Sequence, residues 1–508
     1  MASCHSSKNV TSSSKYSMSK KQKNEVTEVE ETLDDRLSWL PDEVLVQILS
    51  LLPTKDAVSS CVLSKRWRCI WTSIHNFIFI NRNYSKVKNF ISFVDHVITQ
   101  STCSKIKKFQ FDFDRSNREF NSKISLWLSF AVQNKVEDVV LHSFDDNLTY
   151  ELPLCMYTCS SLITLKLSGW VFDEGTGIAW SSLKSLTLHL TELEDSSIAK
   201  LLSSCPALET MELSFCEGCR HLEITSSNLK RLTLTNLSVD VDDYLEIFAP
   251  NLQHLDISGN LGPIEIRLVN VSSLVIASLT FRLSCLEEGW EEDDIEEDSC
   301  YDYHQGIKNL ILDHLQKLSY VTELIIGGWF AEVVFMMKLG GVMLPELRCK
   351  CLTLKLHVSE HNLYGIASLL HTSPHLESLN IHIESQFNDS SSCQLELGYF
   401  AEVDNINLPS WIPNTVFPNL KNVKIIGCPR ECLKDWSEGG FCKLLELLKF
   451  LLMNAVALQK LVMVAKRRKC CYCSESCVSR HLSQLAKKLL DTPRSSKNSV
   501  IIYQEFLA

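Results

Sequence analysis

Short apolar runs alternate with polar residues along most of the chain, and the same alternation returns at a regular interval. The unit has the form apolar-x-x-Leu-x-Leu, as in Leu162-Ile163-Thr164-Leu165-Lys166-Leu167. The clear copies begin 21, 25, 21 and 23 residues apart, at Leu162, Leu183, Leu208, Leu229 and Leu252. Weaker copies begin at Ile106, Val136, Leu274, Val321, Leu376 and Leu420. Alternation with a period of two predicts a short strand in each unit, with its leucines on one face.

A repeat of 20–29 residues with alternating leucines is the signature of leucine-rich repeats. Burying one leucine contributes about 1.5–3 kcal/mol, so a strand with three of them is stable only when other units cover it. Neighbouring units stack and bury these faces in common. The pattern therefore predicts a solenoid over residues 81–400.

The region before the repeats has a different texture, with 19 apolar residues among the 35 from Leu37 to Trp71. A helix that starts after Pro41 is predicted to bury one stripe with helical spacing, formed by Leu45, Ile48, Leu49 and Leu52. Pro53 ends this helix, and Thr54 is expected to cap a second one. A third short helix is predicted to carry Trp67.

Three short helices of this size do not usually form a stable core by themselves. Their surplus of apolar side chains must be covered by the rest of the chain or by a partner. The segment lies near the N-terminus, after a polar tail, and this position favours coverage by a partner. We therefore expect a protein-binding region within residues 34–80.

The remaining segments give further expectations. Residues 1–33 are rich in Ser, Lys and Glu and are expected to form a disordered tail. Residues 287–298 hold nine acidic side chains, which favours an exposed insertion or, alternatively, a contact surface for a basic partner. Gly327–Gly341 breaks the periodicity, and no element is predicted there.

The last hundred residues change pattern again, and residues 401–508 are expected to form an α/β unit that closes the open edge of the solenoid. Strands are predicted at Leu420–Ile426, Leu458–Val464 and Ser499–Gln504, and helices at Phe441–Ala457 and Val478–Leu490.

These residues resemble a known family. Leu40-Pro41-Asp42-Glu43-Val44-Leu45 and Val62-Leu63-Ser64-Lys65-Arg66-Trp67 are similar to the F-box of plant proteins. Leu408-Pro409-Ser410-Trp411 and Pro418-Asn419-Leu420-Lys421 resemble the FBD domain found at the end of many of them. The resemblance implies an α+β chain with a three-helix F-box at 34–80, irregular leucine-rich repeats at 81–400 and an FBD-like unit at 401–508.

The resemblance also implies a function. An F-box of this family grips a Skp-type adaptor, which connects it to a cullin and a RING protein. The chain would be the substrate-recognition subunit of an SCF-type (Skp–cullin–F-box) ubiquitin ligase, with no catalytic activity or cofactor of its own. It would bind an unknown protein client through its repeat and FBD region for ubiquitination. The matching positions imply an adaptor interface of Leu40, Pro41, Leu45, Ile48, Leu49, Val58, Val62, Leu63 and Trp67.

Composition and charge restrict the classes of partner and the cellular compartments that we expect for this chain. With 50 basic and 61 acidic residues the net charge is −11, which disfavours nucleic acid as a partner. The N-terminus lacks the apolar core of a secretory signal, and no long uncharged apolar run predicts a membrane span. We therefore expect a soluble, intracellular protein of the nucleus or cytoplasm, with its 21 cysteines reduced.

Candidate chemistry is sparse. Cys216-x-x-Cys219 is a lone pair in a repeat, where cysteine also packs well. Cys471, Cys473, Cys477 and His481 could close a tetrahedral metal site, but their spacing matches no standard zinc module and no metal is predicted. Two alternatives remain open: a small-molecule-sensing repeat receptor on the same F-box scaffold, and an enzyme that uses this Cys/His group.

Overall fold

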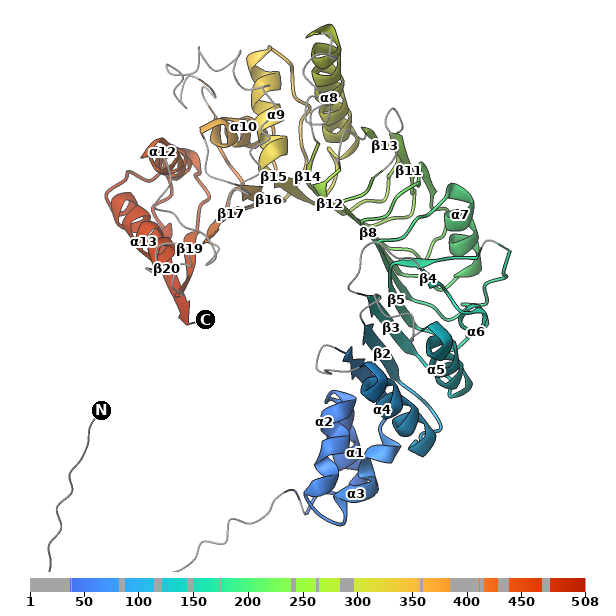
Figure 1. Ribbon diagram of the computed structural model, residues 1–508. Coiled ribbons are helices and arrows are strands. Elements are labelled where there is room, and N and C mark those ends of the chain that lie inside the picture. The colour runs from blue at the N-terminus through green and yellow to red at the C-terminus, as the bar shows by residue number, and fades with distance from the viewer. Residues whose placement is uncertain are drawn as a thin grey trace, which may run out of the picture.

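The strands line the inner side of a curved arc and most helices lie on its outer side (Figure 1). The computed structural model describes residues 37, 39–81, 87–113, 121–143, 150–173, 175–238, 244–261, 265–283, 297–356, 360–383, 411, 415–427, 438–467 and 476–507. The expected disordered tail at 1–33 lies outside these residues. So does the acidic insertion, except for Glu297 and Asp298, which begin a helix and are not part of a loop.

The described residues form one sheet of fifteen strands, in which every pair of neighbours is parallel. In spatial order the strands are β1 (Asn76–Ile80), β2 (Lys108–Phe113), β3 (Asp138–Ser143), β5 (Thr164–Ser168), β7 (Ser185–His189), β8 (Thr210–Ser214), β10 (Arg231–Thr235), β12 (His254–Asn260), β14 (Ile276–Arg282), β15 (Glu323–Gly327), β16 (Cys351–Leu356), β17 (Ser378–Ile383), β18 (Asn422–Gly427), β19 (Lys460–Arg467) and β20 (Val500–Leu507). Apart from the minor strands β4, β6, β9, β11 and β13, spatial order follows chain order.

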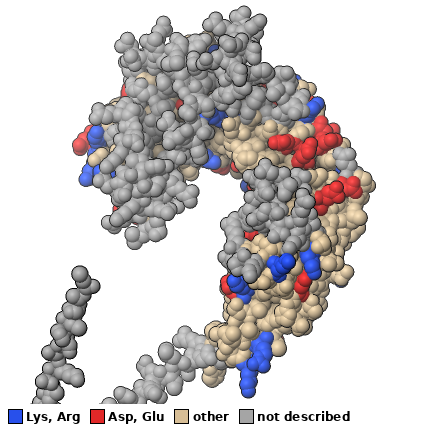
Figure 2. Space-filling view, viewed as in Figure 1, with Lys and Arg blue, Asp and Glu red and all other residues tan. Residues whose placement is uncertain are grey.

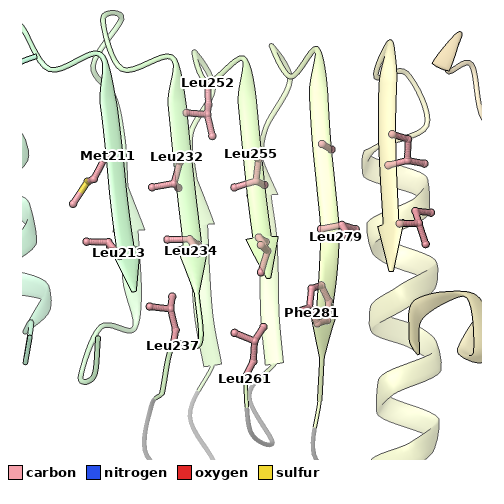
Figure 3. Close-up of a cluster of buried hydrophobic side chains, with 14 of the residues drawn as sticks. Met211, Leu213, Leu232, Leu234, Leu237, Leu252, Leu255, Leu261, Leu279 and Phe281 are labelled. Atoms are coloured by element: carbon pink, nitrogen blue, oxygen red, sulfur yellow. The ribbon is translucent and has the colours of Figure 1, made fainter. Parts of the chain in front are cut away.

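The repeat pattern is confirmed strand by strand. Each clear copy becomes one strand, from β5 to β12, and the weaker copies become β2, β3, β14, β15, β17 and β18. Leu232 pairs in register with Met211 on one side and Leu255 on the other. All three are buried, and Figure 3 shows them side by side on the same face of their strands. This continuous column is the core that no single unit could form.

The outer layer varies along the arc, which makes the solenoid irregular. Its helices are α4 (Val87–Gln100), α5 (Asn121–Gln133), α6 (Leu154–Tyr157), α7 (Asp195–Ser204), α8 (Glu297–Lys317), α9 (Gly328–Leu339), α10 (Glu360–His371), α12 (Glu438–Asn454) and α13 (Cys477–Leu490). A second parallel sheet contains β9 (His221–Glu223), β11 (Tyr244–Phe248) and β13 (Glu265–Asn270), and β4 (Tyr150–Glu151) pairs with β6 (Trp170–Val171).

Helix α9 occupies the segment for which no element was predicted. It buries Phe330, Val334 and Phe335, and its apolar residues surround the helix axis. A helix that is apolar on all sides lacks the 3.6-residue alternation that would reveal it in the sequence. The structure also adds β1 and β16, which were not predicted as repeat strands.

The five elements predicted at the C-terminal end are present as β18, α12, β19, α13 and β20. They extend the main sheet by three strands, and the closure of its edge by this unit stays a prediction. Strand β20 pairs with β19 and is the last strand of the sheet among the described residues. Helix α13 packs on the face of the sheet, where Tyr503 Oη donates to the carbonyl of Ser479 at 3.1 Å.

Candidate functional site

Short helices form the end of the arc next to β1 (Figure 1). They are α1 (Asp42–Ser50), α2 (Thr54–Ser59), the 3-10 turn η1 (Ser60–Val62), α3 (Trp67–Ile70) and the 3-10 turn η2 (Trp71–Ser73). Leu45, Leu49 and Ala57 pack inside this group, and Trp67 is also buried. These side chains join the main hydrophobic core of the chain, so the helices are an extension of the solenoid.

Hydrogen bonds attach these helices to the first strand. The backbone N–H of Ile78 donates to Thr54 Oγ1 at 2.7 Å, and the N–H of His75 donates to Ser50 Oγ at 3.1 Å. Asn76 Nδ2 donates to the carbonyl of Ser50 at 2.8 Å. Strand β1 is the edge of the sheet, and these contacts satisfy polar groups on the side that faces away from β2.

Thr54 therefore has a different role from the predicted one. It was expected to cap α2, but Pro53 occupies the N-cap position and makes no side-chain cap bond. Thr54 is fully buried, and its hydroxyl connects α2 to β1. A Thr after a proline is compatible both with a cap of α2 and with a contact to β1. The position of β1 in the structure distinguishes these two roles.

We predict that Thr54→Val lowers the free energy of unfolding by about 1–3 kcal/mol, because it leaves the part-buried N–H of Ile78 without its acceptor at almost unchanged volume. Chemical denaturation measures the loss, and faster hydrogen exchange at Ile78 locates it. Thr99→Val is the matched control, since the exposed Thr99 hydroxyl donates to the carbonyl of Asp95 in its own helix. Equal stability of the two variants would contradict the assigned role of Thr54.

The same helices leave large apolar side chains uncovered. Single exposed apolar residues are common on protein surfaces, but a concentration of them indicates an interaction site. Trp39 is 82% exposed, Leu51 78% and Val62 83%. We call the whole group the exposed apolar set: Leu37, Trp39, Ile48, Leu51, Leu52, Val62 and Leu63.

The structure separates the nine residues expected at the adaptor interface into three groups. Pro41, Ile48, Val62 and Leu63 are exposed, and Leu40 and Val58 are half-buried. Leu45, Leu49 and Trp67 are buried in the chain's own core. Trp39, Leu51 and Leu52 are also exposed apolar residues next to the predicted positions, and sequence reasoning did not name them.

Polar contacts fix the geometry around the exposed apolar set. The Arg66 guanidinium forms an ion pair with Asp42, with 2.7 Å between Nη2 and Oδ1, and it also donates to the carbonyl of Leu40. This contact ties the start of α3 to the start of α1. Lys55, Lys65 and Arg68 are exposed nearby in the sequence, and Figure 2 shows basic side chains at this end of the arc. These basic side chains around the exposed apolar set would favour a partner with acidic residues.

The candidate cysteines have the properties of buried structural residues. Burial raises the pKa of the Cys216 thiol to about 11 and that of Cys219 to about 12. Both thiols are therefore neutral at physiological pH, whereas redox and metal-binding cysteines need an accessible thiolate. The Cys216-x-x-Cys219 pair does not have the environment of a redox centre.

Only half of the second Cys/His group lies in the described part of the chain. Cys477 is fully buried at the start of α13, and His481 Nδ1 lies 2.9 Å from the carbonyl oxygen of Cys477. Cys471 and Cys473 fall outside the described residues. Within the described ranges, no three His, Cys, Asp or Glu side chains gather as metal ligands would.

A hollow of about 230 Å³ lies on the outer layer, between α10 and the segment after α9. Lys338, Met343, Glu346 and His371 are among the residues that line it. His371 Nδ1 is 2.8 Å from Thr415 Oγ1, and burial lowers the pKa of this histidine. The hollow is smaller than typical ligand pockets of about 300–1,000 Å³ and gives no support to the small-molecule alternative.

None of the helices in the described ranges combines the length and the apolarity that a membrane span requires.

Comparisons with known proteins give matches for the N-terminal helices and for the repeats. The family model described as F-box domain matches residues 37–79. The model described as FBD-associated F-box protein At5g56370, LRR repeats, matches residues 124–287. The chain is also similar to F-box/LRR-repeat protein At5g02910 of Arabidopsis thaliana, at 31% identity over 73% of this chain and 77% of that relative.

Two other Arabidopsis thaliana proteins match over a longer range. F-box/LRR-repeat protein 13 is 29% identical over 92% of this chain and 96% of its own length. F-box/FBD/LRR-repeat protein At1g78750 is 28% identical over the same shares. The similarity therefore extends from the N-terminal helices through the repeats to the C-terminal strands.

Proposed function

The chain belongs to the plant F-box/LRR-repeat protein family, and from this premise we propose that it is the substrate-recognition subunit of an SCF-type ubiquitin ligase. Its F-box binds a Skp-type adaptor, and through that adaptor a cullin and a RING subunit. The solenoid and the C-terminal strands bind a protein client. The chain itself is a non-catalytic adaptor.

One observation carries this proposal. The segment that matches the F-box family exposes Trp39, Leu51 and Val62 almost completely while its own core is already filled by Leu45 and Leu49. Among the described residues, these three side chains make little packing contact. Aromatic and aliphatic residues of this kind form the buried centre of protein–protein interfaces.

The attachment of the F-box helices to β1 supports the proposed binding of a client by the solenoid. Ser50 and Thr54 connect the F-box helices directly to the edge of the sheet, and buried side chains continue from one into the other. A partner bound to the exposed apolar set would therefore have a defined position relative to the inner face of the solenoid. A client held on that inner face would be presented to the ligase in one geometry.

Co-expression of the full chain with a plant Skp-type adaptor tests the proposal. We expect a complex of one copy of each, which size-exclusion chromatography with light scattering would identify. Adding a cullin–RING pair should then recruit both components into one larger assembly. If the chain elutes alone in the presence of excess adaptor, the proposal is wrong.

A further inference from the structure

Part of the inner face carries a row of polar side chains that are aligned in register. They are the third residues of five neighbouring strands, and we call them the central row: Thr187, Glu212, Thr233, Asp256 and Ser278. In each strand the residues on either side of the row are buried in the core, as Leu255 and Ile257 are beside Asp256. Because side chains alternate between faces, the row lies on the opposite, inner face.

A second row runs parallel to the first, two residues further along each strand. Its members are His189, Ser214, Thr235, Ser258 and Thr280. Thr235 and Ser258 are joined by a hydrogen bond of 3.0 Å between their hydroxyls. The two rows together form a surface of short hydroxyl side chains on which Glu212 and Asp256 are the only carboxylates, with no Lys or Arg.

The charge of these carboxylates is not balanced within the described part of the chain. Neither Asp256 nor Glu212 forms an ion pair there, although Arg231 precedes Thr233 by two residues on the same face. Glu212 accepts one hydrogen bond, from Thr187 Oγ1 at 3.3 Å.

Asp256 and Ser278 also have unmet hydrogen-bonding capacity. Asp256 Oδ1 is shielded from solvent and makes no hydrogen bond to a described residue, and the same holds for Ser278 Oγ. The two residues are register partners, and Ser278 is only 3% exposed. Asp256 as a whole is half-buried, so its carboxylate can be approached from the inner side. A polar group buried without a partner costs stability, and such local costs are expected at functional sites.

We propose that the central row binds basic side chains of an extended client segment, with Asp256 as the main acceptor and Glu212 as the second. This inference rests on the proposed function and adds the chemistry of the client. A Lys or Arg side chain would give Asp256 a charge-assisted hydrogen bond and would supply the missing counter-charge. A phosphorylated segment is disfavoured, because both carboxylates would repel a phosphate.

The spacing of the strands predicts a sequence pattern in the client. Glu212 and Asp256 lie two strands apart, which corresponds to about 10 Å at the usual separation of neighbouring strands. A peptide that crosses the strands in the polyproline II conformation advances about 3.1 Å per residue and returns to the same side every three residues, so it covers this distance in three residues with both side chains facing the sheet. The two basic residues should therefore be three positions apart.

A selection from a library of random peptides, with the full chain and its adaptor as bait, tests the proposal. We expect enriched peptides with two basic residues three positions apart. Asp256→Asn should weaken a selected peptide about tenfold, as loss of one charge-assisted hydrogen bond implies. Glu323→Gln, which removes a carboxylate from β15 on the same inner face, should change its affinity less than about twofold.

Three results would overturn the proposal: no enriched peptide, enrichment of acidic or uncharged peptides, or equal binding by the wild type and Asp256→Asn. The melting temperature separates binding from structure, because removing an unpaired carboxylate should leave it unchanged or raise it, whereas removing a structural partner would lower it. If Asp256→Asn fails to fold, Glu212→Gln provides the second measurement and should weaken the preference for one of the two basic positions. Adaptor binding is measured in parallel, so failure of the proposed function would be visible separately.

Discussion

Replacing Val62 and Leu63 together with aspartate should abolish binding to a Skp-type adaptor and leave the fold intact. The two side chains are 83% and 63% exposed, so the substitutions remove little packing within the chain. At an interface, each side chain would contribute about 1.5–3 kcal/mol by burial, and each aspartate would in addition have to lose its hydration. We expect the affinity to fall at least about 100-fold in a calorimetric titration.

The control for this experiment is a pair of equally exposed leucines outside the F-box. Leu126 on α5 and Leu154 on α6 are 63% and 66% exposed. Leu126→Asp with Leu154→Asp introduces the same charges into the same chain and should bind the adaptor like the wild type. Equal loss of affinity in both double variants would show that the effect is not specific to the exposed apolar set.

Gly365→Ala should destabilise the solenoid by about 2–3 kcal/mol, in contrast to the helix-stabilising effect that alanine usually has. Gly365 lies within α10, where the helix passes directly over α9. A Cβ atom at this position would come within 1.9 Å of the carbonyl oxygen of Ala331, and a backbone atom can give way only if the two helices separate.

Gly306→Ala is the matched control for the stability measurement. Gly306 also lies within a helix, α8, but a Cβ atom there would meet nothing within 4 Å. The substitution should raise the free energy of unfolding by about 0.5–1 kcal/mol, because alanine restricts the unfolded chain. Denaturant titration of both variants checks the opposite signs. A stabilising effect at Gly365 would contradict the close contact of α9 with α10.

The repeats could be predicted because their periodicity is a direct consequence of the fold. Each strand must place its leucines on one face, and the chain must return to the next strand within a limited number of residues. Strand β18 follows the same rule 44 residues after the start of the preceding copy, with α12, β19, α13 and β20 continuing the alternation. The sequence of β16 fits the pattern as well, and its Leu352 and Leu354 are buried like the leucines of the other strands.

Other features depend on tertiary contacts that leave no periodic trace. Helix α9 is apolar on all sides, and the strands β9, β11 and β13 replace helices in the outer layer only in the middle of the arc. The way in which the last strands extend the main sheet could not be anticipated from the elements alone, since the same five elements can be arranged in more than one way.

The candidate site shows the same limit at the level of single residues. Helix α1 has two apolar rows, and the helical spacing of Leu45, Ile48, Leu49 and Leu52 does not tell which row faces inward. The structure buries Leu45 and Leu49 and exposes Ile48 and Leu52. Likewise, Asp256 occupies a position of its repeat that the leucine pattern does not specify, and only the packing around it shows that its Oδ1 makes no hydrogen bond to a described residue.

Hydrogen exchange of the full chain with and without a Skp-type adaptor tests the central claim most directly. We predict that the adaptor slows exchange from Leu37 to Trp67, most strongly around Leu51 and Val62, and leaves the strands β10 to β14 unchanged. Unchanged exchange throughout that N-terminal segment, or protection confined to the solenoid, would contradict the account.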